Sequence, residues 1–210
     1  MRPRLDWSLY LITDRRLACG RPIEDIVTGA VRGGVTMVQL REKECSTRHF
    51  VELARILKRI LTPAGVPLII NDRADVALAA RADGVHLGQS DMDCRDARRL
   101  LGADAIVGLS VETPEQAVQA ANYPVDYLGV GPIFATSTKP DAAPDWGLPR
   151  LAALRAQTRQ ALVAIGGIHA GNARQVMEAG ANGIAVVSAL CAASDPEKAA
   201  RVLRAAAARC

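Results

Sequence analysis

Short apolar runs alternate along the chain with longer amphipathic segments, and the count is eight of each. Short, mostly apolar runs are typical of strands buried on both faces, whereas the longer segments are typical of helices. The alternation therefore predicts eight β-strands, each followed by a helix. The predicted strands cover residues 8–14, 36–42, 67–72, 84–88, 105–111, 127–133, 161–167 and 183–188.

The segments between the predicted strands carry helix signals of their own. In residues 50–61 the apolar side chains fall on one stripe and the charged ones point largely elsewhere, which is typical of an outer helix packed on a barrel. Thr113 matches the N-cap of a helix, with Pro114 at the first helical position and Gln116 three residues on, which is a capping-box pattern. Ser194 with Glu197 forms a second capping-box pattern. Connections of this length make neighbouring strands parallel.

Eight β-α units account for nearly all of the 210 residues. We therefore expect one α/β domain over residues 1–210, with the fold of a (β/α)8 TIM barrel. A doubly wound open sheet is the alternative. That fold normally places a glycine-rich dinucleotide loop after its first strand, whereas the first strand here ends in Thr13, Asp14, Arg15 and Arg16. The sequence at this turn favours a closed barrel.

Composition narrows the classes of partner. The chain is 50% hydrophobic and 3% aromatic, and its net charge of +4 comes from basic residues scattered among 22 acidic ones. Nucleic-acid binding usually requires a basic patch or an aromatic stacking surface. We therefore expect small anionic substrates as partners and no nucleic acid.

Cysteine use and hydropathy indicate a cytoplasmic protein. The five cysteines are odd in number and widely spaced, without a C-x-x-C pair, so we expect reduced thiols. No segment approaches the roughly 18 apolar residues of a membrane span, and the first residues are not followed by an apolar stretch. We expect no membrane partner, and the sequence leaves a homo-oligomer open.

Basic side chains follow the second predicted strand. Side chains alternate with a period of two along a strand, so Gln39, Arg41 and Lys43 share one face and two cations converge on the barrel mouth. A solvated strand end would explain a single lysine. An inward arginine, however, needs an anion to offset its desolvation, which favours a binding site.

Two acidic residues are candidates for a metal site. The third strand ends in Asn71 and Asp72, and Asp91 follows the fourth strand. Two carboxylates facing each other across the rim would give Mg2+ two oxygen ligands, with substrate phosphates and water completing the octahedron. Two structural alternatives remain open, namely Asp91 as a helix cap and Asp72 paired with Arg73.

Phosphate-binding features follow the last three strands. The loop 134–146 is long and carries hydroxyl groups beside Lys139, which fits either a lid that closes over phosphate or an exposed polar loop. The glycine pair 166–167 ends the seventh strand, and Val187 and Ser188 end the eighth. TIM barrels often bind phosphate at these two strand ends through backbone amides.

His86 lies within the fourth strand and has two interpretations. It could act as a base, or it could be a core histidine satisfied by a neighbour. No Ser-His-Asp or Cys-His spacing indicates an enzyme nucleophile. Cys45, near the mouth, is interpreted as a small buried apolar residue.

Seven segments resemble the thiamine-phosphate synthase family in collinear order, over almost the whole chain. They are residues 9–14, 39–43, 71–73, 84–89, 131–134, 136–139 and 166–168. The resemblance implies a transferase of thiamine biosynthesis that joins a hydroxymethylpyrimidine diphosphate to a hydroxyethylthiazole phosphate and releases pyrophosphate. It implies Mg2+ as cofactor and a dissociative substitution that needs no enzyme nucleophile.

The resemblance also assigns roles to residues. The pyrimidine diphosphate would be bound by Gln39, Arg41, Lys43, Asn71 and Lys139, and Mg2+ by Asp72 and Asp91. The pyrimidine side would be contacted by Ser110 and Thr138, and the thiazole phosphate by Thr136, Gly167, Val187 and Ser188. The residues expected to act in catalysis are Arg41, Lys43, Lys139 and Ser110. Ala135 stands where the family often has proline, and we expect this to affect only the stiffness of the loop.

Two other functions fit the same barrel. A thiazole tautomerase would need a base, and similar tautomerases place a histidine after the fifth strand, where this chain has Glu112. A non-catalytic phosphate-binding barrel would keep the pocket at the last two strands without chemistry. The combination of two acids with three cations favours the synthase.

Overall fold

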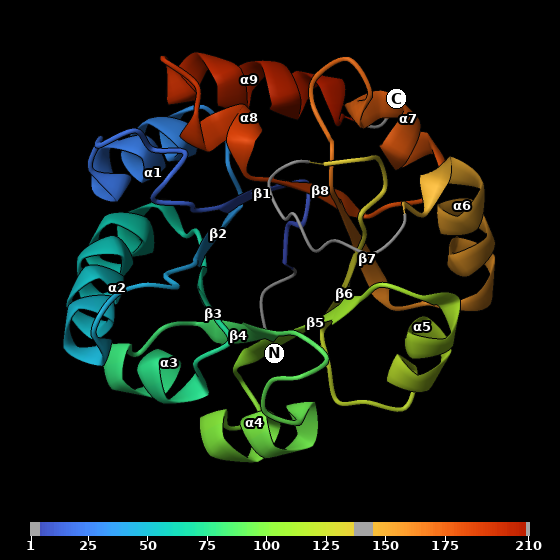
Figure 1. Cartoon of the computed structure of the whole chain (residues 1–210), viewed down its shortest axis with the longest axis horizontal. Coiled ribbons are helices and arrows are strands. Elements are labelled where there is room, and N and C mark those ends of the chain that lie inside the picture. The colour runs from blue at the N-terminus through green and yellow to red at the C-terminus, as the bar shows by residue number, and fades with distance from the viewer. Residues whose placement is uncertain (1–4, 137–144, 209–210) are drawn as a thin grey trace.

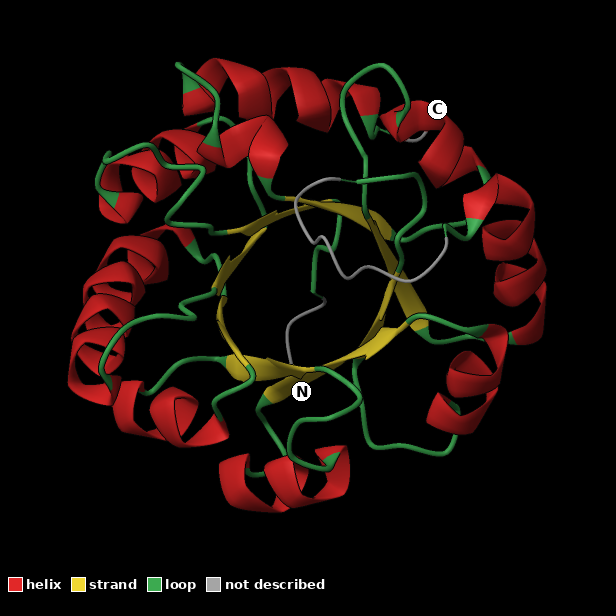
Figure 2. Cartoon of the chain, viewed as in Figure 1, coloured by secondary structure: helices red, strands yellow, loops and turns green. Residues whose placement is uncertain are grey.

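The computed structural model describes residues 5–136 and 145–208. Its centre is a closed barrel in which each parallel strand pairs with the next in chain order and β8 pairs with β1. Helices surround this barrel on its outside (Figure 1, Figure 2). The pairing of β1 with β8 confirms the (β/α)8 barrel and excludes the open-sheet alternative.

Each observed strand lies inside the range expected from its apolar pattern. Most predicted ranges extend too far at the C-terminal end, because the chain leaves the strand ladder and enters a loop before the pattern ends. The strands are β1 (Leu9–Ile12), β2 (Met37–Leu40), β3 (Leu68–Asn71), β4 (Gly84–Leu87), β5 (Ile106–Val111), β6 (Tyr127–Val130), β7 (Ala161–Ile165) and β8 (Gly183–Val186).

A helix follows every strand, and a second one follows β8. The helices are α1 (Ile23–Arg32), α2 (Thr47–Leu61), α3 (Ala74–Ala80), α4 (Cys94–Leu101), α5 (Pro114–Ala120), α6 (Gly147–Gln157), α7 (Ala173–Glu178), α8 (Ser188–Cys191) and α9 (Pro196–Ala206), with a 3-10 turn, η1 (Thr62–Ala64), after α2. The predicted stripe of residues 50–61 is the buried face of α2, which begins three residues earlier because Ser46 caps it.

The start of α5 confirms its predicted cap. The Thr113 hydroxyl accepts a hydrogen bond from Gln116 N at 3.3 Å, and Pro114 takes the first helical position. The Gln116 side chain in turn accepts from Glu112 N at 2.7 Å, so the reciprocal bond reaches one residue further back than a standard capping box.

The predicted cap of the last helix at Ser194 is wrong. Asp195 caps α9, because its side chain accepts from Lys198 N at 2.9 Å. Proline has no N–H to donate and fits the first helical turn, so Pro196 begins the helix and the residue before it becomes the cap.

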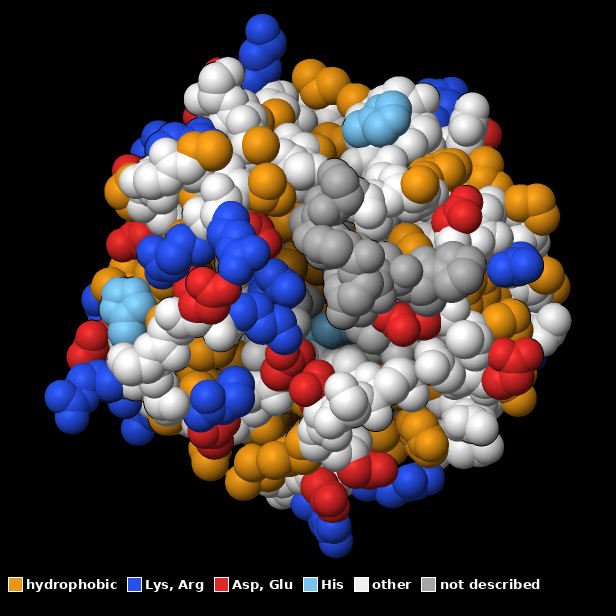
Figure 3. All heavy atoms as spheres, in the orientation of Figure 1, with side chains coloured by type: hydrophobic (Ala, Val, Ile, Leu, Met, Phe, Trp, Pro, Cys, Tyr) orange, Lys and Arg blue, Asp and Glu red, His pale blue; other side chains and the backbone are white. Residues whose placement is uncertain are grey.

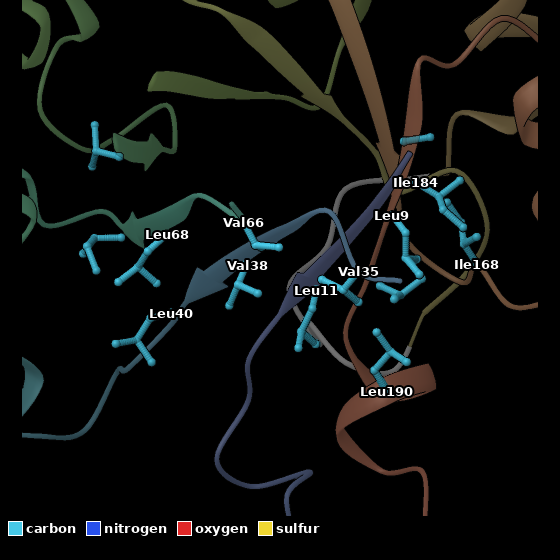
Figure 4. Packing of buried hydrophobic residues seen from close by; sticks show 14 of the residues in the cluster. Leu9, Leu11, Val35, Val38, Leu40, Val66, Leu68, Ile168, Ile184 and Leu190 are labelled. Atoms are coloured by element: carbon cyan, nitrogen blue, oxygen red, sulfur yellow. The ribbon is translucent and has the colours of Figure 1, made fainter. Parts of the chain in front are cut away.

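Alternate strand residues pack into two apolar layers. Leu9 and Leu11 of β1 and Val38 and Leu40 of β2 belong to the layer between the barrel and the helices (Figure 4). The intervening positions point into the barrel, as the period of two requires. The apolar and aromatic side chains inside the barrel are Tyr10, Ile12, Met37, Ile69, Ile106, Tyr127, Val163 and Ala185.

The N-terminal end of the barrel is held by an ion pair between Asp6 and α9. Arg204 lies 2.8 Å from Asp6 Oδ2, and Ser8 N donates to Asp6 Oδ1 at 2.9 Å. Burial by itself raises the pKa of Asp6, but the hydrogen bonds from Arg204 and Ser8 outweigh it and hold the pKa at about 2. A cavity of about 750 Å³ beside this pair is also lined by Trp7 and Asp126. It lies at the opposite end of the barrel from the mouth that carries the predicted site.

Candidate active site

The polar side chains singled out in the sequence, as far as the structure describes them, lie at or just beyond the C-terminal ends of the strands. Parallel strands of a barrel all end at the same rim, so residues far apart in the sequence meet there. Basic side chains gather beside acidic ones on one side of the barrel opening, toward β2 and β3 (Figure 3). This rim is therefore the candidate active site.

Lys43, Asp72 and Asp91 form one cluster at the rim. Lys43 Nζ lies 2.7 Å from Asp72 Oδ2. Asp72 lies close enough to Asp91 to raise the pKa of the Asp91 carboxyl. The barrel thus brings together one cation and two carboxylates from the ends of β2, β3 and β4.

Both structural alternatives for the two acids are wrong. Arg73 pairs with Asp75 at 2.6 Å and leaves Asp72 to Lys43. The cap of α4 is Asp93, not Asp91. Helix capping and a local ion pair therefore do not account for the placement of the two rim carboxylates.

The backbone holds the two carboxylates in place. Asp72 has a positive φ of 63°, and its N–H donates to the carbonyl of His86 at 2.8 Å. A non-glycine residue in this conformation costs roughly 1 kcal/mol or more and is often found at functional sites. Asp91 Oδ2 accepts from Gly88 N at 2.7 Å, which turns the carboxylate back over the end of β4.

The electrostatics of the acidic pair favour a bound cation. Burial raises the pKa of Asp91 and the adjacent Asp72 raises it further, whereas the Gly88 N–H and Lys43 act in the opposite direction. Two carboxylates in contact repel one another unless a proton or a cation lies between them. Among the described residues, no group of three or more His, Cys, Asp or Glu side chains is arranged to hold a metal.

Arg41 is oriented by the end of β1. Its guanidinium lies 3.3 Å from Asp14 Oδ2, and its backbone N–H donates to Thr13 Oγ1 at 3.0 Å. The other oxygen of Asp14 accepts from Leu17 N at 3.1 Å, which fixes the carboxylate. From the sequence, Arg41 was expected to need an anion as its partner. In the structure this anion is the carboxylate of Asp14. A guanidinium has several N–H groups, so one bond to Asp14 leaves further donors for a ligand.

A chain of hydrogen bonds crosses the inside of the barrel below this rim. Gln39 Nε2 donates to Tyr10 Oη at 2.9 Å, and Tyr10 Oη lies 2.9 Å from Tyr127 Oη. Tyr127 Oη is 2.8 Å from His86 Nδ1, and His86 Nε2 is 2.8 Å from Ser110 Oγ. Gln39, predicted to bind the pyrimidine diphosphate, and Ser110, predicted to contact its pyrimidine side, are therefore the two ends of one continuous chain.

His86 is a core histidine satisfied on both ring nitrogens. Burial lowers its pKa to about 4, with the charge of Asp72 acting in the opposite direction, so the imidazole is neutral at pH 7. Of the two interpretations from the sequence, the structure supports the satisfied histidine.

Sequence reasoning did not identify Tyr10 and Tyr127 as parts of the site. Both are fully buried inside the barrel, with exposures of 1% and 0%. The available signal was their inward position in β1 and β6, on the same strand face as the rim residues. Their contact depends on closure of the barrel, because 117 residues separate them in the chain.

Two glycines make room for this hydrogen-bond chain. A Cβ atom on Gly108 would lie 2.4 Å from Tyr127 Oη, and one on Gly129 would lie 2.9 Å from His86 Cε1. Neither side chain could keep its place if these glycines carried a methyl group. Tyr127 and His86 are therefore held by the backbone of β5 and β6.

The predicted thiazole-phosphate residues lie around the ends of β6, β7 and β8. Gly167 has a positive φ of 62°, and a Cβ atom there would lie 2.7 Å from the carbonyl of Ala135. This close approach packs the start of the loop after β6, which leads to Thr136, against the end of β7. Val187 and Ser188 begin α8 at the end of the neighbouring β8, and Ser188 is exposed.

Trp146 anchors the far end of the loop after β6. Its side chain is buried, its indole N–H donates to the carbonyl of Glu112 at 2.9 Å, and its backbone N–H donates to the carbonyl of Pro132 at 2.7 Å. Both ends of the loop are thus fixed to the barrel. Thr138 and Lys139 lie outside the described residues.

Asn71 and Cys45 complete the set of residues singled out in the sequence. Asn71 is the last residue of β3 and is 9% exposed, so it lies below the acidic cluster, next to Asp72 in the chain. Cys45 is partly buried against the apolar core, rather than fully buried as expected.

In the described part of the chain, no helix is both long and apolar enough to cross a membrane.

Comparisons with known proteins agree on one family. A family model described as thiamine monophosphate synthase matches residues 9–190. The thiamine-phosphate synthase of Albidiferax ferrireducens is 60% identical over 93% of this chain and 90% of its own length. That of Syntrophomonas wolfei is 54% identical over 95% of both chains. Among solved structures, the thiamine phosphate pyrophosphorylase from Pyrococcus furiosus superposes with a TM-score of 0.89 at 38% identity, covering 97% of this chain and 96% of that one.

Proposed function

The chain belongs to the thiamine monophosphate synthase family, and on this premise we propose that it joins a hydroxymethylpyrimidine diphosphate to a hydroxyethylthiazole phosphate, forming thiamine phosphate and pyrophosphate. Membership makes the chain a transferase of thiamine biosynthesis. The observation that supports these substrates best is the cluster of Lys43, Asp72 and Asp91 beside Arg41 at one rim of the barrel.

Arg41 and Lys43 have the chemistry to stabilise the leaving group. In the proposed substitution, the bond between the pyrimidine methylene carbon and the diphosphate oxygen breaks, and its electron pair leaves with the diphosphate. Fixed positive charge next to that oxygen lowers the barrier, because the negative charge on the diphosphate grows in the transition state. Asp14 holds the Arg41 guanidinium in position. Lys139 and Asn71 would add further contacts.

The donor set at the rim fits Mg2+. Asp72 and Asp91 supply oxygen ligands close to one another, and their repulsion would be relieved by a divalent cation. Mg2+ commonly takes one or two carboxylates and completes its octahedron with phosphate oxygens and water, which agrees with the small number of acids at this rim. Bound there, the ion would supply further positive charge against the diphosphate.

The second half of the reaction needs an ordered, dry pocket. The pyrimidine cation would be captured by the thiazole nitrogen, which forms the new C–N bond, and water would compete for the same carbon. Thr136, Gly167, Val187 and Ser188 would hold the thiazole phosphate at the ends of β6 to β8, and Ser110 and Thr138 would contact the pyrimidine. The loop fixed by Trp146 would exclude water when it covers both substrates.

An assay with both substrates tests this proposal. We expect thiamine phosphate and pyrophosphate to form in equal amounts with Mg2+ and to fall to background when a chelator is added. Pyrophosphate without thiamine phosphate, or neither product, would rule out the synthase reaction. Conversion of a thiazole carboxylate phosphate in the absence of Mg2+ would indicate the tautomerase instead.

A cytoplasmic location is part of the same proposal. The cysteines in the described residues, Cys19, Cys45, Cys94 and Cys191, all carry free thiols, which fits a reducing compartment.

A further inference from the structure

The hydrogen-bond chain inside the barrel joins side chains from five strands, and its middle is sealed from water. Tyr10 and Tyr127 are buried among apolar side chains of the barrel interior. A buried hydroxyl without a partner would cost about 1–3 kcal/mol, so each hydroxyl must use its neighbours in the chain. Within the described residues, the one sealed side-chain polar atom without a partner is Gln160 Oε1, which lies outside this chain.

The first donor sets the direction of the whole chain. The amide nitrogen of Gln39, Nε2, can donate hydrogen bonds but cannot accept them, so Tyr10 Oη is the acceptor of this bond. Tyr10 must therefore donate its own hydroxyl proton to Tyr127 Oη. Tyr127 then donates to His86 Nδ1. A neutral imidazole carries one N–H, so the proton of His86 is on Nε2 and is donated to Ser110 Oγ.

The direction of the hydrogen bonds leaves the Ser110 hydroxyl as a donor at the barrel mouth. Ser110 Oγ accepts from His86, so its own O–H is free to donate to a ligand. Ser110 is partly exposed, in contrast to the tyrosines. The Gln39 amide, anchored through its nitrogen, keeps its oxygen as an acceptor.

We propose that Tyr10, Tyr127 and His86 form a positioning relay that fixes the Ser110 hydroxyl as a hydrogen-bond donor toward the pyrimidine substrate. The relay rests on the proposed function, because the partner of this donor would be a ring nitrogen of the aminopyrimidine. None of the three relay residues needs to touch the substrate. They determine which way the hydroxyl proton of Ser110 points.

The packing of the barrel makes the relay rigid. Gly108 and Gly129 bring the backbone against Tyr127 and His86, so the two rings cannot shift to accept another hydrogen-bond pattern. The rings of Tyr10 and Tyr127 also pack edge to face, with centroids 5.9 Å apart. A donor that is held in one direction favours a ligand whose acceptor atom lies in that direction. A donor that is buried by the ligand without a partner costs binding free energy.

The histidine tautomer tests the relay directly. Nitrogen NMR of protein labelled at its histidines, of which the chain has three, distinguishes Nε2–H from Nδ1–H. Variants His49→Gln and His169→Gln, both at exposed positions, assign the remaining signal to His86. We expect the neutral Nε2–H form alone at pH 7. A dominant Nδ1–H form would mean that the chain runs in the opposite direction and would overturn the proposal.

Kinetics of Tyr127→Phe test the consequence for the substrate. The variant keeps the ring and removes the hydroxyl that links Tyr10 to His86. We expect the KM for the pyrimidine diphosphate to rise about tenfold, the equivalent of about 1.4 kcal/mol, while the KM for the thiazole phosphate stays within about twofold. Tyr123→Phe is the matched control, because Tyr123 stacks with Arg95 away from the barrel interior and should leave both values unchanged.

Two results would contradict the relay. An unchanged KM for the pyrimidine diphosphate, or an equal rise for both substrates, would show that Tyr127 has only a structural role. If Tyr127→Phe does not fold, Tyr10→Phe removes the neighbouring hydroxyl and is expected to change the KM values in the same way. The NMR experiment requires no turnover, so an enzyme that fails to make thiamine phosphate would refute the proposed function without affecting the test of the tautomer.

Discussion

The ammonium group of Lys43 lies 2.7 Å from the carboxylate of Asp72, so a residue proposed to bind the diphosphate is paired with one proposed to bind Mg2+. Each group thereby neutralises the other in the free protein. Binding of a magnesium diphosphate would supply new partners to both: the cation would take over the carboxylate, and the phosphate oxygens would take over the ammonium. The rim is therefore prepared for a substrate that brings both charges at once.

Replacing Lys43 should separate metal binding from catalysis. In Lys43→Met the acidic pair loses its neutralising partner, so we expect Mg2+ to bind the free protein about threefold more tightly. Turnover should fall roughly 100-fold, because a charge on the leaving group is lost. Calorimetric titration with Mg2+ and the assay of thiamine phosphate measure the two effects. Weaker binding of Mg2+ in the variant would contradict the assigned pairing.

Removing one acidic charge should stabilise the protein without metal. Asp91→Asn keeps an oxygen that can accept from Gly88 N but removes the repulsion with Asp72. We expect the melting temperature in chelator to rise by about 2 °C and the Mg2+-dependent activity to fall roughly 100-fold. Thermal unfolding with and without Mg2+ provides the measurement. Asp93→Asn, at the cap of α4 close by in the chain, is the control and should retain activity.

Gly167 should tolerate no side chain. In Gly167→Ala the methyl group would meet the carbonyl of Ala135 at 2.7 Å in a residue that already has a positive φ. We expect a loss of about 2 kcal/mol in the free energy of unfolding and a higher KM for the thiazole phosphate, because the start of the loop after β6 is displaced.

Gly65→Ala separates the clash from the backbone strain. Gly65 has nearly the same φ, +65° against +62°, but nothing lies within 4 Å of its Cβ position. We expect this variant to lose only about 1 kcal/mol and to keep its KM values. Urea unfolding and steady-state kinetics compare the two variants. Equal losses of unfolding free energy in Gly167→Ala and Gly65→Ala would mean that contact of the new methyl group with Ala135 has no effect.

The ion pair of Asp6 with Arg204 should make part of the stability depend on pH. The folded pKa of Asp6, about 2, lies below its ordinary value of 3.8, so this contribution is present above pH 4 and is lost as the pH falls toward 2. Asp6→Asn should therefore be less stable than the wild type at pH 7, and the difference should shrink below pH 4. Because the pair is partly exposed, we expect a small effect, measured by urea unfolding at several pH values. A difference that is constant with pH would contradict the assignment.

The sequence by itself determined the fold and the rim. Eight apolar runs of strand length, separated by helical segments, specify a barrel because each strand must be buried on both faces. The change from apolar to polar residues at each strand end marks the edge where ligands bind, so Gln39, Arg41, Lys43, Asp72 and Asp91 could be found without coordinates. A period of two was enough to place Gln39 on the inward face of β2, whereas Arg41, Lys43, Asp72 and Asp91 lie in the loops beyond the strand ends.

Only the tertiary structure decided which of these groups touch. The pairing of Lys43 with Asp72 and the hydrogen bond between Tyr10 and Tyr127 join residues 29 and 117 positions apart. Such contacts depend on the closure and register of the barrel and on the space left by Gly108 and Gly129, none of which a local pattern records. Periodicity is a property of one strand, whereas a hydrogen bond requires two atoms to lie within about 3 Å of each other, and that distance is fixed only when all strands are in place.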